Sequence, residues 1–260
     1  NVNQLIQKKD SSHSIIGPDR MHVSKPGYFV MANQFLNSPD IHKKVSNLSI
    51  DAEKKKLISQ DNCKVENIRA TSSSLSFTYL GKSLPFPSPE GINVDSLQAF
   101  TDNMNADIIQ IKGLKSGAYQ LLIDTTIVGL FSNKDFENGI NLSKYQKTPQ
   151  YQQASSILKL FDEYWKTERT LRVMKYVEYS HLASVINKDD MEEVKKVFDS
   201  ILEKSKTSPN FGFFGNVFKT YLSNKPQEKE LVSKLESLHD SIYQINTPVI
   251  HDYKIEKVIK

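Results

Sequence analysis

The sequence Gly17-Pro18-Asp19-Arg20-Met21-His22 runs directly into Val23-Ser24-Lys25-Pro26-Gly27-Tyr28. This stretch joins a Gly-Pro turn to the start of a helix. Ser24 is suited to cap that helix, and Pro26 is suited to its first turn, where a missing N–H costs nothing. The apolar residues that follow recur at helical spacing and predict one apolar face, which ends at Asn37-Ser38-Pro39: Tyr28, Met31, Ala32, Phe35 and Leu36.

Asp19 and His22 place an acid and an imidazole three residues apart. At this spacing the carboxylate can accept a hydrogen bond from one ring nitrogen, which leaves the other nitrogen as a base. That arrangement is the acid–base half of a serine hydrolase triad. The same spacing is also typical of a capping aspartate beside a surface histidine, which is the more common arrangement. Spacing alone leaves both interpretations open.

The surroundings of this pair resemble the last sequence block of the SGNH (GDSL-type) esterases, in which Asp-x-x-His is followed by Pro26-Gly27-Tyr28 and an apolar helix. A second similarity, to the C-terminal extension of a bacterial subgroup of that family, lies downstream. The residues that carry it are Gly113-Leu114, Gly117-x-Tyr119-x-Leu121-x-Ile123-Asp124, Gly139-Ile140-Asn141-Leu142, Thr148-Pro149 and Gln153-Ala154. Together the two matches cover roughly residues 13–180.

The resemblance implies that Asp19 and His22 complete a catalytic triad. In the family, a Gly-Asp-Ser block with the nucleophile, and a Gly and an Asn that donate to the oxyanion, all precede the Asp-x-x-His block. None of those blocks occurs in this chain, so the nucleophile is unknown and expected upstream of Asn1, on an upstream segment or a companion chain.

The implied reaction is serine-type hydrolysis of carboxylic (acyl or acetyl) esters without a cofactor, and the family's substrates range from lipids to acetylated sugars. The resemblance also favours a periplasmic or secreted protein. The alternative is a non-catalytic module, derived from such an enzyme, that binds a carbohydrate or a protein partner. The missing nucleophile block favours this alternative for the chain itself.

Composition excludes several other classes. The 34 basic and 30 acidic residues are interleaved, so the net charge of +4 predicts solvated faces and no nucleic-acid partner. The single cysteine, Cys63, excludes an intrachain disulfide and a Cys-rich zinc site, and no histidines have metal-binding spacing. No apolar run approaches the roughly 18 residues that a transmembrane helix needs.

Periodicity divides the chain into three parts. We expect residues 1–44 to be the end of an α/β catalytic domain with a flavodoxin-like sheet, of which only the last part is present. Residues 45–146 show period-two alternation, as in Leu75-x-Phe77-x-Tyr79, and predict an antiparallel β module. Residues 147–260 predict long helices and a terminal edge strand. The chain itself is therefore predicted to be α+β.

Four local predictions follow from the same patterns. Residues 133–138 should form a short helix closed by Gly139, and a long helix capped by Thr148 should bury Trp165. The aromatic cluster at 210–215 could line a pocket, but a loop packed on the core is the favoured interpretation. The adjacent pairs His239-Asp240 and His251-Asp252 should lie at the surface.

Overall fold

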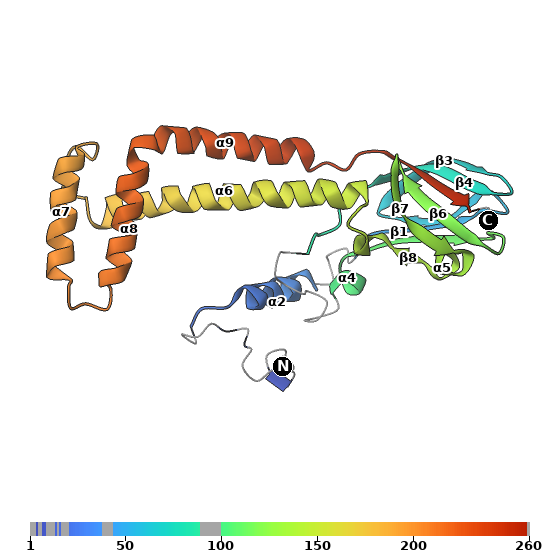
Figure 1. The fold of residues 1–260 in the computed structure, drawn as a ribbon, viewed down its shortest axis with the longest axis horizontal. Helices are drawn as coiled ribbons and strands as arrows, with labels where there is room; N and C mark the ends of the chain where they lie inside the picture. The colour runs from blue at the N-terminus through green and yellow to red at the C-terminus, as the bar shows by residue number, and fades with distance from the viewer. Residues whose placement is uncertain are drawn as a thin grey trace. The chain divides into compact units, whose positions relative to one another are not determined.

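A computed structural model of the chain describes residues 4, 7, 8, 14, 16, 21–37, 44–88 and 100–258. It divides into two compact units, each described by itself below. A β-rich unit contains residues 1–156 and 246–260, and a helical unit contains residues 157–245. The predicted α+β class, with a β module and a long-helix region, is confirmed (Figure 1).

The β-rich unit contains two sheets whose inner faces share one apolar core. The four-stranded sheet has the order β2-β1-β5-β8, with β2 Lys56–Asp61, β1 Lys44–Asp51, β5 Ala106–Lys112 and β8 Ile140–Asn141. The five-stranded sheet has the order β3-β4-β9-β6-β7, with β3 Cys63–Ala70, β4 Ser74–Gly81, β9 His251–Lys257, β6 Ala118–Ile123 and β7 Thr126–Ser132.

The period-two pattern explains how the sheets bury their inner faces. On β4, Leu75, Phe77 and Tyr79 are at most 4% exposed, while the residues between them face outward. Strands β1 and β5 pair in parallel, however, so the predicted antiparallel module contains one parallel pair. Parallel strands need a long crossover connection, and here 54 residues of chain, including β2, β3 and β4, separate β1 from β5.

Strand β9 corrects the prediction of a terminal edge strand. It lies at the centre of its sheet, where it pairs with β4 on one side and with β6 on the other. Its alternate residues His251, Tyr253 and Ile255 are buried. Alternation reveals which face of a strand is buried but not which strands lie beside it, so the sequence pattern could not distinguish a centre from an edge.

The helices of this unit begin and end where local chemistry predicts. Helix α2, Lys25–Leu36, is capped by Ser24, whose Oγ accepts a hydrogen bond from the backbone N–H of Gly27 at 3.3 Å. Helix α5, Asn133–Asn138, has a capping box at Ser132 and ends at Gly139, whose φ of +93° favours glycine. The described part of this unit also contains α4, Phe100–Asn103, and η1, Leu142–Lys144.

Helix α6, Pro149–Ser180, begins in the β-rich unit, and its residues from Ile157 onward belong to the helical unit. The Thr148 Oγ accepts from the Tyr151 N–H at 3.4 Å, which confirms the predicted cap. Trp165 was predicted to be core but is 54% exposed. Apolar spacing marks a stripe on a helix, but it does not show which part of a 32-residue stripe other elements cover.

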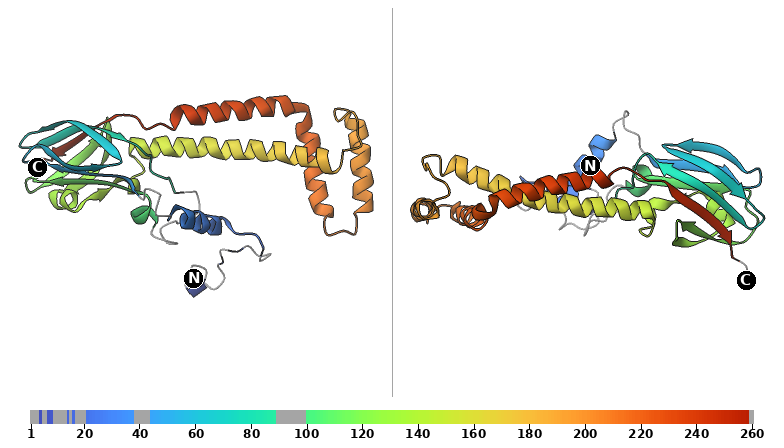
Figure 2. Two further views of the ribbon diagram at one scale, coloured as in Figure 1. Left: turned by 180° about the vertical axis from the view of Figure 1, so that it is seen from behind. Right: turned by 90° about the horizontal axis from the view of Figure 1, so that it is seen from above.

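The helical unit also contains α7, Met191–Lys204, α8, Phe211–Asn224, η2, Lys225–Gln227, and α9, Glu228–Ile245. Helices α7 and α8 lie side by side, and α9 runs back along α6 (Figure 2). The core between them includes Phe198 and Phe218, whose rings stack 4.1 Å apart. The predicted loop at 210–215 is instead the start of α8, so its two glycines are tolerated inside a helix.

Lys225 connects three helical elements of this unit. Its Nζ lies 2.7 Å from the Glu178 Oε1 and 2.6 Å from the Glu228 Oε2, and its side chain is only 10% exposed. The Tyr221 hydroxyl donates to the same Glu178 carboxylate at 3.3 Å. These contacts hold the end of α8 to α6 and to the start of α9.

Lys175 also pairs with Glu178 and Glu228, but it is 60% exposed, so Lys225 is the buried cation of this cluster. We expect Lys225→Met to lower the free energy of unfolding by about 2 kcal/mol, because the variant leaves two partly buried carboxylates with only the exposed Lys175 as their cation. Chemical denaturation of the chain measures this loss. Lys206→Met removes an exposed pair with Glu203 and serves as the control, with an expected change below about 0.5 kcal/mol. Equal losses in the two variants would contradict the assignment.

Candidate functional site

His22 lies two residues before the N-cap of helix α2, and its side chain is exposed. An antiparallel bridge pairs Ile16 with Val23, so the chain on the two sides of residues 17–22 comes together. Ser24 reinforces this closure, because its hydroxyl donates to the Ser14 carbonyl at 3.3 Å. Asp19, the predicted partner of His22, lies outside the described residues.

The predicted apolar face of helix α2 is exposed in this chain. Tyr28, Met31 and Phe35, which the helical spacing places on that face, are 58%, 45% and 75% exposed. The residues that α2 buries are Gly27, Val30 and Asn33. The apolar stripe therefore faces solvent in this chain, and the helix is attached to the β-rich unit through its other face.

A small apolar cavity of about 260 Å³ lies beside the attached face of α2. The rings of Phe29, Phe86 and Phe100 form one cluster there, with centroids 5.0–6.4 Å apart. Asn105 fixes the segment that carries Phe86, since it accepts from the Phe86 N–H at 2.7 Å and donates to the Phe86 carbonyl at 2.8 Å. The sequence did not predict this cluster, because its members come from separate segments.

A buried polar chain crosses the core of the β-rich unit. The Tyr79 hydroxyl donates to the Ser46 Oγ at 2.9 Å, and the Ser46 hydroxyl donates to the Asp107 Oδ1 at 2.6 Å. Asp107 is 4% exposed, and burial raises the pKa of its carboxyl to about 6, although its hydrogen bonds with Ser46 and Tyr79 act in the opposite direction. Ser46 is 1% exposed, so a substrate cannot reach this hydroxyl.

A second Asp–His pair joins Asp124 to His251. The His251 Nδ1 lies 2.8 Å from the Asp124 Oδ2, and the Asp252 N–H donates to the other oxygen of Asp124 at 2.9 Å. His251 is 6% exposed, which corrects the prediction that it lies at the surface, whereas His239 is exposed as predicted. Asp124 follows β6 directly, so this pair fixes the β6–β7 turn to β9. We assign it a structural role.

The described residues contain no cluster of three or more His, Cys, Asp or Glu side chains that could hold a metal ion. No helix among them is both long enough and apolar enough to cross a membrane.

Comparisons with known proteins identify one relevant structure. No protein-family model matches the chain, and no curated protein matches it. Among solved structures, the chain is similar to BT4096, a gut microbial diltiazem-metabolizing enzyme, with a TM-score of 0.80 and 28% sequence identity. The match covers 99% of this chain and 60% of the enzyme. The chain thus shares its fold with part of a longer enzyme.

Proposed function

We propose that the chain belongs to a serine-type hydrolase of carboxylic esters, similar to the SGNH (GDSL-type) esterases, and that it supplies the acid–base half of the triad. The observation that carries the proposal is the Asp19-x-x-His22 block, which directly precedes the capped start of α2. The fold shared with a metabolizing enzyme supports it. That enzyme is longer than this chain, so the remaining part of such a protein is the expected source of the nucleophile.

In this mechanism a serine from outside the 260 residues attacks the ester carbonyl. His22 takes the proton of the serine hydroxyl and later gives it to the leaving alkoxide. Asp19 holds the His22 ring in the required tautomer and stabilises the imidazolium. Exposure of His22 fits this role, because a general base must be within reach of the nucleophile and the substrate.

A fluorophosphonate probe followed by mass spectrometry tests the proposal. We expect a label on a serine outside residues 1–260 of the complete protein, and we expect no label on this chain alone. A label on a serine within the chain would show that the nucleophile belongs to these 260 residues, against the proposal. Absence of any label from an active complete protein would overturn the serine mechanism.

The exposed stripe of α2 provides a second test. If the rest of the enzyme covers Tyr28, Met31 and Phe35, Phe35→Ala should lower the free energy of unfolding of the complete protein by about 3 kcal/mol. The same variant of the 260-residue chain should change it by less than about 0.5 kcal/mol, since Phe35 is 75% exposed there. Denaturant titrations of both proteins measure the difference.

Val30→Ala is the matched control for this experiment. Val30 is 5% exposed in the chain itself, so its truncation should destabilise the chain and the complete protein by similar amounts. If Phe35→Ala had no effect in either protein, α2 would not pack against the rest of the enzyme.

A further inference from the structure

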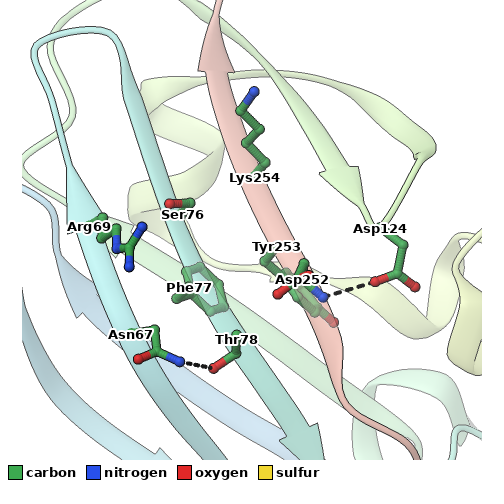
Figure 3. A pocket seen from close by; sticks show the side chains of 9 residues that line it. All are labelled: Asn67, Arg69, Ser76, Phe77, Thr78, Asp124, Asp252, Tyr253 and Lys254. Carbon is green, nitrogen blue, oxygen red and sulfur yellow. Dashed lines mark hydrogen bonds between the residues drawn. The ribbon is translucent and has the colours of Figure 1, made fainter.

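The outer face of the five-stranded sheet carries a polar trough of about 500 Å³ that runs along β4 (Figure 3). Its floor is made by Ser76 and Thr78, whose side chains point outward because Phe77 and Tyr79 point into the core. Longer side chains stand on the two flanking strands, with Arg69 on β3 and Lys254 on β9. Short residues between long ones make this face of the sheet concave.

The strand register sorts the charges of the trough into two rows. Arg69 lies opposite Ser76, which lies opposite Lys254, so one row reads cation, hydroxyl, cation across three adjacent strands. In the neighbouring row, Thr78 lies opposite Glu66 on β3 and opposite Asp252 on β9, and the exposed Glu66 carboxylate pairs with Lys64 at 2.8 Å. Asn67 completes this second row, because its Nδ2 donates to the Thr78 Oγ1 at 3.3 Å. Across the strands, the second row therefore has the Glu66 carboxylate and the Asn67 amide on β3, the Thr78 hydroxyl on β4 and the Asp252 carboxylate on β9.

A β-bulge places the side chains of β3. The register of β3 against β4 shifts between Glu66 and Arg69, and Asn67 adopts a φ of +57°, in the left-handed region. A bulge re-aims the side chains around it and is frequent beside binding sites. Here it brings the Asn67 amide over β4 and leaves Arg69 level with Ser76.

The charged groups of the cation row are available to a ligand. Within the described part of the chain, the Arg69 guanidinium has neither an ion pair nor a hydrogen bond. Lys254 pairs with Glu256 at 2.7 Å, but both side chains are about half exposed, and such pairs contribute little. In the other row, Asp252 uses its backbone N–H toward Asp124, and no described residue pairs with its carboxylate.

We propose that this trough binds an acidic saccharide. The sugar carboxylate lies between Arg69 and Lys254 above the Ser76 hydroxyl, because paired cations and a hydroxyl donor satisfy a carboxylate. The ring hydroxyls lie over the second row, where the Asn67 amide and the Asp252 carboxylate can donate and accept. This proposal concerns the β-rich unit alone and does not depend on ester hydrolysis.

Other ligand classes fit the trough less well. A polyanion without hydroxyl groups would bring its charges against Asp124 and Asp252 at one end of the site. An apolar ligand would find only polar outward side chains, since Phe77 and Tyr253 border the trough from within the core and are 2% exposed. Two cations, two carboxylates, hydroxyls and an amide match a molecule that carries both a carboxylate and many hydroxyls.

Isothermal titration of the 260-residue chain with trigalacturonate, and with the neutral maltotriose, tests the proposal. We expect trigalacturonate to bind at least tenfold more tightly than maltotriose. Arg69→Ala should weaken trigalacturonate binding at least tenfold. Arg69→Lys should weaken binding less, since lysine keeps the positive charge but cannot form the two parallel hydrogen bonds of a guanidinium. Thr78→Val should weaken it several-fold because it removes a hydroxyl at constant shape.

Lys56→Ala on β2 is the control, because Lys56 is an exposed lysine of the other sheet and should leave the affinity unchanged. Thermal unfolding of each variant verifies the fold. No heat of binding up to about 10 mM trigalacturonate would overturn the proposal. Equal affinities for the two sugars, or equal losses in Arg69→Ala and Lys56→Ala, would also overturn it, since each would show non-specific contact.

Discussion

Under the proposed ester hydrolysis, replacing His22 with alanine in the complete protein is expected to lower kcat by about 10²–10⁴-fold, the usual contribution of a positioned general acid–base group. The variant should keep its fold, because the His22 side chain is exposed and precedes α2 instead of lying within it. KM should change little, since the imidazole acts on the proton of the nucleophile and not on substrate affinity. Steady-state kinetics on a chromogenic acetyl ester measure both constants.

His239→Ala is the matched control for this experiment. His239 is also an exposed histidine beside an acid, with its Nδ1 3.5 Å from the Asp240 Oδ1, but it lies in the helical unit. Its replacement should leave kcat unchanged. Asp19→Asn should reduce kcat as well, because the amide no longer favours the required His22 tautomer. If ester hydrolysis persisted in His22→Ala at the wild-type rate, the assignment of this histidine would be wrong.

Local signals were enough to predict much of the fold. The Ser24 cap, the Gly139 helix end and the alternation in β4 each depend on residues a few positions apart, and the structure confirms all three. The orientation of α2 could not be predicted in this way. Its apolar stripe is present as expected, but the direction in which a stripe faces depends on which other elements are available to cover it.

The polar features of the β-rich unit depend on long-range register instead. Ser46 and Asp107 are 61 residues apart in sequence, and His251 meets Asp124 across 127 residues. The row of Arg69, Ser76 and Lys254 likewise combines strands from opposite ends of the unit. No short motif contains these residues, so the sequence gives no local signal for any of the three arrangements.

The second large effect concerns the dependence of stability on pH at Asp107. Burial raises the pKa of this carboxyl from 3.8 to about 6 in the folded chain. Below a pH of about 3 the carboxyl is protonated in both the folded and unfolded states, so its ionisation costs no stability there. As the pH rises toward 6, the unfolded chain ionises first, and the folded state loses stability by about 3 kcal/mol in total.

Asp107→Asn should remove this loss, because the amide is neutral at every pH and its oxygen can still accept the Ser46 hydrogen bond. The difference in free energy of unfolding between variant and wild type should therefore shift in favour of the variant by about 3 kcal/mol between pH 3 and pH 7. Urea titrations at several pH values measure it.

Carboxylates with lowered pKa, such as that of Asp135, act in the opposite direction in both proteins, so the difference cancels them. The buried neighbours Tyr79 and Cys63 have raised pKa values, chiefly through burial, and do not ionise in this range. A difference that stayed constant from pH 3 to pH 7 would show that the Asp107 carboxyl ionises as readily in the folded chain as in water.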